Sequence, residues 1–257
     1  MNGLGSLLVS GLVLVLAVAG AAAGMWLRRF LPEDHLSADS KTVINLAMGL
    51  VGTMSALVLG LLIGQAHTSY QQQVTGLEQM SAQIVVVDRI IARVGPAAQP
   101  ARRMLKIAVT AALERIWSEK IDGGQHLDDS STTARATAAY DSLSDLTGLE
   151  PRQAALRDQA LQMLTTIGQT RWLLFEEAAG NTLQAPFLAV LILWLVILFA
   201  SFGLMSPQNA TVKAAMVAAA VSVAGAVFLI LELNAPFNGI LRISNLPLRA
   251  ALSHMGS

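Results

Sequence analysis

The sequence contains no cysteine and carries little charge. Without cysteine the chain forms no disulfide, no thiolate metal site and no cysteine nucleophile, and either redox compartment fits this composition. Only 13% of the 257 residues are charged, whereas a soluble domain usually has about a quarter. The 17 basic and 17 acidic residues cancel, so no global basic field attracts nucleic acid. The composition therefore argues against an ordinary cytosolic enzyme and against nucleic-acid binding.

Signatures of catalysis and metal binding are also missing. The chain has no HExxH, GxSxG, P-loop or glycine-rich dinucleotide pattern. Its four histidines show no metal-ligand spacing with a partner and lie at positions 35, 67, 126 and 254. We predict no enzymatic activity, no catalytic residue, no metal and no cofactor.

Long apolar runs dominate what is present. A helix that crosses a bilayer needs about 20 mostly apolar residues, and four runs meet this length: Leu4–Leu27, Val43–Ala66, Pro186–Ser206 and Val212–Leu233. A cleaved signal peptide ending at residues 21–23 is an alternative for the first run. No basic residue precedes that run and two arginines follow it, which favours a retained span. We predict an all-α, multi-pass protein of the inner membrane with four transmembrane helices.

The polar segment between the second and third runs predicts a helical, coiled-coil-like soluble insert. Apolar residues there recur at alternating spacings of three and four, from Tyr70 to Val94 and again from Leu156 to Leu174. The second run and the first of these helices join without a break until Gly95-Pro96, which predicts one helix of about 78 Å at 1.5 Å per residue. The other helix starts near Pro151 and returns antiparallel to it.

Two shorter helices are expected between these stalks, over residues 101–120 and, more weakly, 132–146. No stretch alternates with period two, so we predict no sheet. The expected domains are a first transmembrane pair at 1–66, the insert at 67–184, and a second transmembrane pair with a broken-helix motif at 185–257.

Basic residues beside the runs barely decide which side the insert faces. Four lie toward one side and three toward the other: Arg28, Arg29, Lys41 and Lys213 against Arg171, Arg242 and Arg249. Residues 66–87 contain no lysine or arginine, which leans the insert slightly outward, toward the periplasm.

Small and polar residues line one face of the second run. The candidates are Asn45, Gly49, Thr53, Gly60 and Gly64, with His67 at the end of the run, and Gly52 and Ala56 extend the four-residue repeat. In lipid, such a face permits close helix packing within or between subunits. Alternatively, it lines a narrow pore in which Asn45 and Thr53 offer oxygen atoms. Both interpretations stay open.

A polar motif follows the fourth run. Glu232 is the one ionisable candidate inside an apolar run, and the residues after it include Asn234, Pro236, Phe237, Gly239 and Arg242. Proline and glycine interrupt a helix, and broken backbone at membrane depth requires protein or water around it. Glu232 is therefore either an interfacial carboxylate paired with Arg242 or part of a pore mouth or ion site.

Three stretches are similar to a family of bacterial and plant membrane proteins called bestrophin-like: FGLMSPQNAT at 202–211, FLILELNAPFNG at 228–239 and RIS at 242–244. The resemblance covers nearly the whole chain. It implies an oligomeric, ring-shaped anion channel with a helical soluble domain. Members usually carry aspartate where this chain has Asn234, and often arginine at the position of Gln208, so an ion role of that acid would fall here to Glu232. The aromatic-rich neck of bestrophin pores has no counterpart on the glycine face.

The expected function is thus a homo-oligomeric channel, possible for anions, with a pore lined by the second run and with the bilayer, ions and further copies of the chain as partners. The alternative is a non-conducting interaction or signalling protein whose coiled-coil insert recruits a partner. The insert, which is nearly half of the chain, motivates this alternative because a pore alone does not need it.

Overall fold

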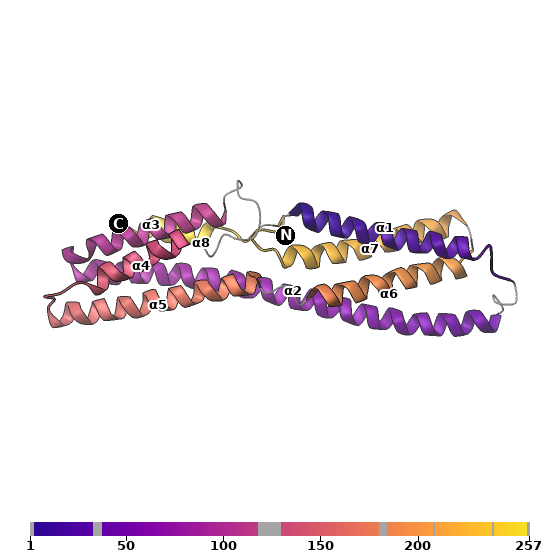
Figure 1. The fold of residues 1–257 in the computed structure, drawn as a ribbon, viewed down its shortest axis with the longest axis horizontal. Helices are drawn as coiled ribbons and strands as arrows, with labels where there is room; N and C mark the ends of the chain where they lie inside the picture. Colours follow the sequence, from indigo (N-terminus) through magenta and orange to yellow (C-terminus); the bar gives the residue numbers. More distant parts are fainter. Residues whose placement is uncertain are drawn as a thin grey trace. The chain divides into compact units, whose positions relative to one another are not determined.

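The computed structural model describes residues 3–32, 38–117, 130–179, 184–207, 209–237 and 239–255. These residues form helices and short connections without any strand, which confirms the predicted all-helical class. In chain order the elements in Figure 1 are α1 Gly3–Leu27, α2 Ala38–Val94, the short 3₁₀ helix η2 Pro96–Ala98, α3 Gln99–Ile116, α4 Ser130–Ser144, α5 Pro151–Ala179, α6 Gln184–Met205, α7 Ala210–Leu233 and α8 Leu246–His254.

The chain divides into two compact units. One, called the apolar unit below, comprises Met1–Ser69 and Asn181–Leu241; the other, the polar unit, comprises Tyr70–Gly180 and Arg242–Ser257. Helix α2 contributes its first part to the apolar unit and its last part to the polar unit. The residues after the fourth apolar run therefore group with the helices of the insert.

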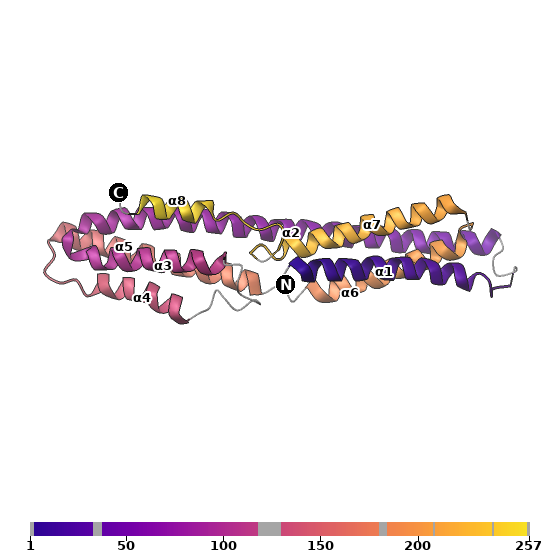
Figure 2. The ribbon, with the colours of Figure 1, turned by 90° about the horizontal axis from the view of Figure 1, so that it is seen from above.

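Four helices in the described part of the chain are long and apolar enough to cross a membrane, and they coincide with the four predicted runs: α1, α2, α6 and α7. The continuity of α2 from Ala38 to Val94 confirms the expected long helix. Within the apolar unit, α1 packs against both α6 and α7 (Figures 1 and 2).

Helices α1 and α6 approach until their backbones touch. A Cβ atom added to Gly24 would lie 1.9 Å from the carbonyl oxygen of Ala200, and one added to Gly203 would lie 2.0 Å from that of Ala21. Gly20 is similarly close to Val196, at 2.9 Å from its carbonyl oxygen. Small residues at an interface permit such an approach, since dispersion rather than hydrophobic exclusion stabilises helix pairs in lipid.

The part of α2 in the apolar unit joins this bundle through one face. Leu62 and Ala66 are buried in a cluster with Leu191 and Leu195 of α6 and Ile230 of α7. A second cluster combines Ala17 and Ala21 of α1 with Phe199 and Ala220. The core of the unit therefore consists largely of alanine and leucine.

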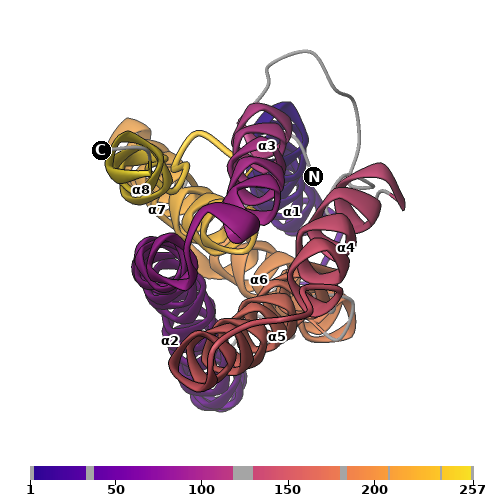
Figure 3. The same cartoon turned by 90° about the vertical axis from the view of Figure 1, so that its left-hand side faces the viewer.

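In the polar unit, the predicted apolar repeat of α2 forms the core. Leu77, Ile84, Val87, Ile91 and Val94 are buried. Gly95 then ends the helix with a φ of 118°, a left-handed conformation that favours glycine, and Pro100 lies in the first turn of α3. Helix α3 lies between α4 and α8 (Figure 3), while α5 begins at Pro151 as expected and contacts α2 where Leu174 meets Gly76.

Candidate functional site

All six candidates of the second run lie on the exposed side of α2 within the apolar unit. Asn45, Gly49, Thr53, Gly60, Gly64 and His67 are each exposed. At about 100° per residue these positions fall within roughly 100° of the helix circumference. The structure therefore brings them together on one face, called the small-residue face below.

No other part of the described chain packs closely on this face. A Cβ atom added to Gly49, Gly60 or Gly64 would have no neighbour within 4 Å, and one at Gly52 would only reach Leu198, at 3.9 Å. In the most apolar window of α2 only 11% of the residues are buried, compared with 33% in α1 and 28% in α6 and α7. Close packing within one subunit is therefore not the role of these glycines.

The small-residue face offers oxygen atoms but no formal charge. Residues 45–69 contain no aspartate, glutamate, lysine or arginine. The Thr53 hydroxyl donates to the carbonyl of Gly49, and the Thr68 hydroxyl donates to that of Gly64 at 2.9 Å. Each hydroxyl proton is thus used within the helix, which leaves the oxygen lone pairs as acceptors. Chemically, the face suits contact with water or hydrated ions rather than proton transfer.

A second sector adjoins the small-residue face on α2. It carries large apolar side chains that are more than 60% exposed: Val43, Leu46, Leu50, Leu57 and Leu61. Such side chains suit acyl chains or the apolar surface of another subunit. The exposed half of α2 is therefore divided into a small, polar sector and a large, apolar one.

At the end of α7, Glu232 organises the break in the helix. It is fully buried, and its Oε2 atom accepts the backbone N–H groups of Ile240 and, at 3.1 Å, of Leu241. The N–H of Gly239 donates to the carbonyl of Ala235 at 2.8 Å and closes the turn between them. A Cβ atom on residue 239 would lie 2.6 Å from Oε2, so the loop requires glycine at this position.

The motif after α7 therefore forms one connected structure. The helix ends at Leu233, as its proline and glycine indicate; Pro236 is buried, while Asn234 and Phe237 are half-buried. The expected ion pair between Glu232 and Arg242 stays a prediction, because the contacts described for Glu232 are to backbone groups. Gln208, Asn238 and His126 lie outside the described residues.

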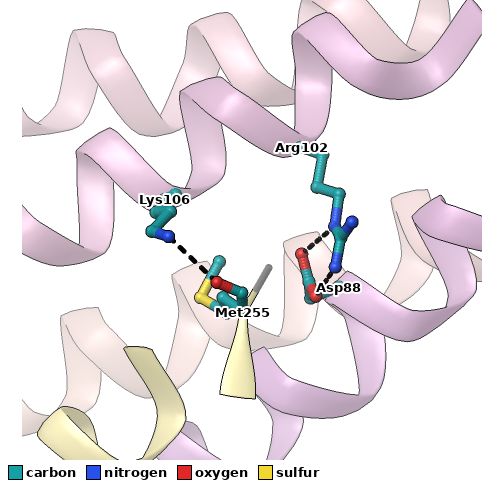
Figure 4. Close-up of polar contacts among 4 residues, drawn as sticks. All are labelled: Asp88, Arg102, Lys106 and Met255. Carbon is teal, nitrogen blue, oxygen red and sulfur yellow. Dashed lines mark hydrogen bonds and ion pairs between the residues drawn. The ribbon is translucent and has the colours of Figure 1, made fainter. Parts of the chain in front are cut away.

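Sequence reasoning missed a buried ion pair in the polar unit. The Asp88 carboxylate accepts two hydrogen bonds from Arg102, with Nε–Oδ1 at 2.7 Å and Nη2–Oδ2 at 2.8 Å (Figure 4). The hydrogen bond to Asp88 raises the pKa of the Arg102 guanidinium above its ordinary value. A signal was available, because Asp88 directly follows Val87, a position of the apolar repeat.

The same unit holds the carboxyl-terminal segment through two further hydrogen bonds from α3 and its end. Lys106 Nζ donates to the carbonyl of Met255 at 3.0 Å (Figure 4), and Trp117 Nε1 donates to that of Ile243 at 2.8 Å. Ile243, Leu248, Ala251 and Met255 are buried. These contacts explain why residues 242–255 group with the insert. Among the residues that the structure describes, no three His, Asp or Glu side chains gather as a metal site would require.

Comparison with known proteins agrees with this architecture. The sequence matches the bestrophin-like domain over residues 15–248. No curated protein matches the sequence. Among solved structures, a point mutant of a bacterial bestrophin homologue from Klebsiella pneumoniae is similar, with a TM-score of 0.62 and 16% identity over 96% of this chain and 98% of that chain. Another point mutant, described as a membrane protein, has a TM-score of 0.66 and 14% identity over 96% and 99% of the two chains. At these identities the likeness establishes a common fold.

Proposed function

The chain belongs to the bestrophin-like family, and from that premise we propose that it forms a homo-oligomeric ion channel in the inner membrane. In this proposal α1, α2, α6 and α7 cross the bilayer. The small-residue face of α2 lines the pore from Asn45 past Thr53 to Gly64, and the pore opens near His67. The protein conducts ions without catalysing a reaction and without a cofactor.

The openness of the small-residue face is the observation that carries this proposal. Glycines that serve packing within the subunit touch backbone, as Gly24 and Gly203 do, whereas Gly49, Gly60 and Gly64 face open space. Glycine at an exposed lipid-facing position only lowers helix stability, by about 1 kcal/mol relative to alanine. Three such positions on one face are better explained by a narrow passage, where any larger side chain obstructs ions.

The same geometry favours several copies of the chain. One apolar unit offers a single open face, and one face does not enclose water at membrane depth. Copies related by a rotation axis place equal faces around that axis, with the large apolar sector of α2 toward lipid or the next subunit. Anions are the ions that the family name suggests, and the printed description of the Klebsiella protein as a bestrophin homologue agrees with that suggestion.

Replacing Gly60 by leucine tests the pore directly. The face leaves room for the side chain within one subunit, so Gly60→Leu should still fold while it obstructs conduction. Gly225→Leu is the matched control, because Gly225 also lies on an exposed helix face with nothing within 4 Å. Single-channel recording in planar bilayers should give a conductance at least about tenfold lower for Gly60→Leu and parent conductance for Gly225→Leu. Unchanged current in Gly60→Leu would remove α2 from the pore.

Native mass spectrometry in nanodiscs tests the assembly. We expect four or more copies, since fewer cannot surround a hydrated path with a single helix face each. A monomer or dimer would contradict the channel and favour a protein that recruits a partner.

The alternative interaction function depended on an apolar stripe left over on the insert. The structure buries the residues that would provide it: Leu77, Met80, Ile84 and Val87 are at most 7% exposed within one subunit. Partner binding through this stripe would require the polar unit to open. The channel is therefore the better-supported of the two proposals.

A further inference from the structure

Charge is unevenly distributed within the polar unit. From Arg89 to Leu113 the chain has five basic residues and no acidic residue. Residues 234–257 of the same chain add two arginines and one histidine, again without an acid. In contrast, residues 141–158, which span the end of α4 and the start of α5, contain four acidic residues and two arginines. The overall neutrality of the protein therefore hides a basic region and an acidic one.

The nearest carboxylate does not offset the basic region. Asp88 is engaged by both Nε and Nη2 of Arg102, and its side chain is only 2% exposed. One positive and one negative charge thus cancel inside the unit. The remaining charges of this region lie at its surface: Arg89, Arg93, Arg103 and Lys106 are all exposed. We call these four residues the basic face.

The ion pair also sets the spacing of the basic face. Asp88 and Arg102 join α2 to α3, so their sequence neighbours Arg89 and Arg103 are held at the same level of these two helices. Arg93 follows Arg89 by one turn, and Lys106 follows Arg102 by one turn (Figure 4). Lys106 donates to a neutral carbonyl, that of Met255, and so keeps its charge uncompensated there. Like charges held this close together create a positive potential in the adjacent water.

The composition of the region favours small ions over a macromolecule. Residues 89–113 contain no aromatic side chain, whereas protein interfaces depend on aromatic anchors and single-stranded nucleic acid depends on stacking. Exposed arginines on two helices act instead through a long-range field, which raises the local concentration of mobile ions of opposite sign.

We propose that the basic face concentrates small inorganic anions, such as chloride, next to the polar unit. Where the channel function proposed above holds, on which this second step rests, the face makes Arg89, Arg93 and Arg103 determinants of the preference for anions over cations. Arg102 has a different role, because its charge is spent on Asp88.

Thiol labelling measures the potential without requiring any current. The chain has no cysteine, so Ala97→Cys, at an exposed position between α2 and α3, creates a single target. The reagents are an anionic and a cationic methanethiosulfonate of similar size, and the ratio of their reaction rates cancels differences in thiol reactivity. At about 10 mM salt, where the Debye length is about 30 Å, we expect the parent to favour the anionic reagent about tenfold more than the triple variant Arg89→Gln, Arg93→Gln, Arg103→Gln.

Two controls make this result specific. Gln159→Cys, exposed beside Asp158 on α5, should show no anionic preference and should react equally in parent and triple-variant backgrounds, which also reports that the variant is folded. Arg152→Gln removes an exposed charge from α5 and should leave the ratio at residue 97 unchanged. Equal rates of the two reagents at Ala97→Cys in the parent would overturn the proposal.

Reversal potentials in a potassium chloride gradient test the second step. The triple variant should lower the chloride-to-potassium permeability ratio about threefold or more in dilute salt, and hardly at all near 1 M, where charges are screened within about 3 Å. An unchanged ratio in dilute salt would refute the role in selectivity. If the parent carries no current at all, the proposed channel function fails, while the thiol rates still decide whether the face concentrates anions.

Discussion

Glycines repeat at four-residue spacing in both α1 and α2, yet the two helices use them in opposite ways. In α1, Gly20 and Gly24 let the backbone of α6 approach within contact distance, whereas Gly60 and Gly64 of α2 border open space. The same sequence pattern thus marks the tightest and the loosest surfaces of one bundle. A small-residue repeat states that something must come close; it does not state whether that is a helix, a second subunit or an ion.

The largest effect is expected where backbone meets glycine. Gly24→Ala puts a Cβ atom 1.9 Å from the carbonyl oxygen of Ala200, and α6 must move as a whole to relieve the clash. We expect the free energy of unfolding to fall by about 3 kcal/mol or more, because overpacking of a rigid interface is costly. Gly11→Ala in the same helix, with no neighbour within 4 Å, is the control for a denaturation series in detergent. Equal stability of the two variants would contradict the described α1–α6 interface.

A smaller loss is expected where glycine meets a side chain with two hydrogen bonds. Gly239→Ala places its Cβ 2.6 Å from Glu232 Oε2 and should cost about 1–3 kcal/mol, the range for hydrogen bonds to charged groups. Glu232→Ala removes the same bonds from the other side. A double-mutant cycle measured by thermal unfolding should therefore be non-additive. Fully additive losses would mean that Gly239 does not serve the Glu232 contact.

On the open face, alanine should help rather than harm. Gly60→Ala has no neighbour to strike and should stabilise the subunit by about 0.5–1 kcal/mol through helix propensity. Gly225→Ala on α7 should do the same. This comparison also separates the two interpretations of the face. If Gly60→Ala weakens the oligomer in native mass spectra while Gly225→Ala does not, the face is a packed interface between subunits rather than a pore lining.

The smallest effect is expected at Gly76 in the polar unit. An added Cβ would lie 2.8 Å from Cδ2 of Leu174, and this atom is the end of a flexible side chain that can rotate away. The gain in helix propensity, about 1 kcal/mol, should nearly cancel the cost of rotation. Chemical denaturation followed by circular dichroism should place Gly76→Ala within about 1 kcal/mol of the parent. A loss as large as that of Gly24→Ala would mean that α2 and α5 are too tightly packed for Leu174 to move.

Much of the helical framework could be predicted because its causes are local. The run that begins near Leu4 became α1, and the continuity of α2 as far as Gly95 followed from apolar spacing and a glycine stop. The insert helices expected at 101–120 and 132–146 are present as α3 and α4, with ends shifted by a few residues. Helix ends depend on caps and tertiary contacts, which spacing alone does not reveal.

The candidate site divides along the same line. Sequence spacing placed Asn45, Thr53 and Gly60 on one face, and the structure agrees. The backbone partners of Glu232 and the Asp88–Arg102 pair were not predicted, since each joins residues whose proximity depends on the path of the chain. The same holds for Lys106 and Met255, which are separated by 149 positions in sequence and joined by one hydrogen bond.

By itself, the sequence determined that this protein is helical, apolar over four long runs and interrupted after Leu233, because hydrophobic length, periodicity and the chemistry of proline and glycine act within a few turns of one chain. Only the tertiary structure decided which glycines are covered and which are open, and where charges cancel. Both depend on what lies across the helix from a residue, and a side chain's neighbours in space are set by the packing of the whole bundle rather than by its neighbours in sequence.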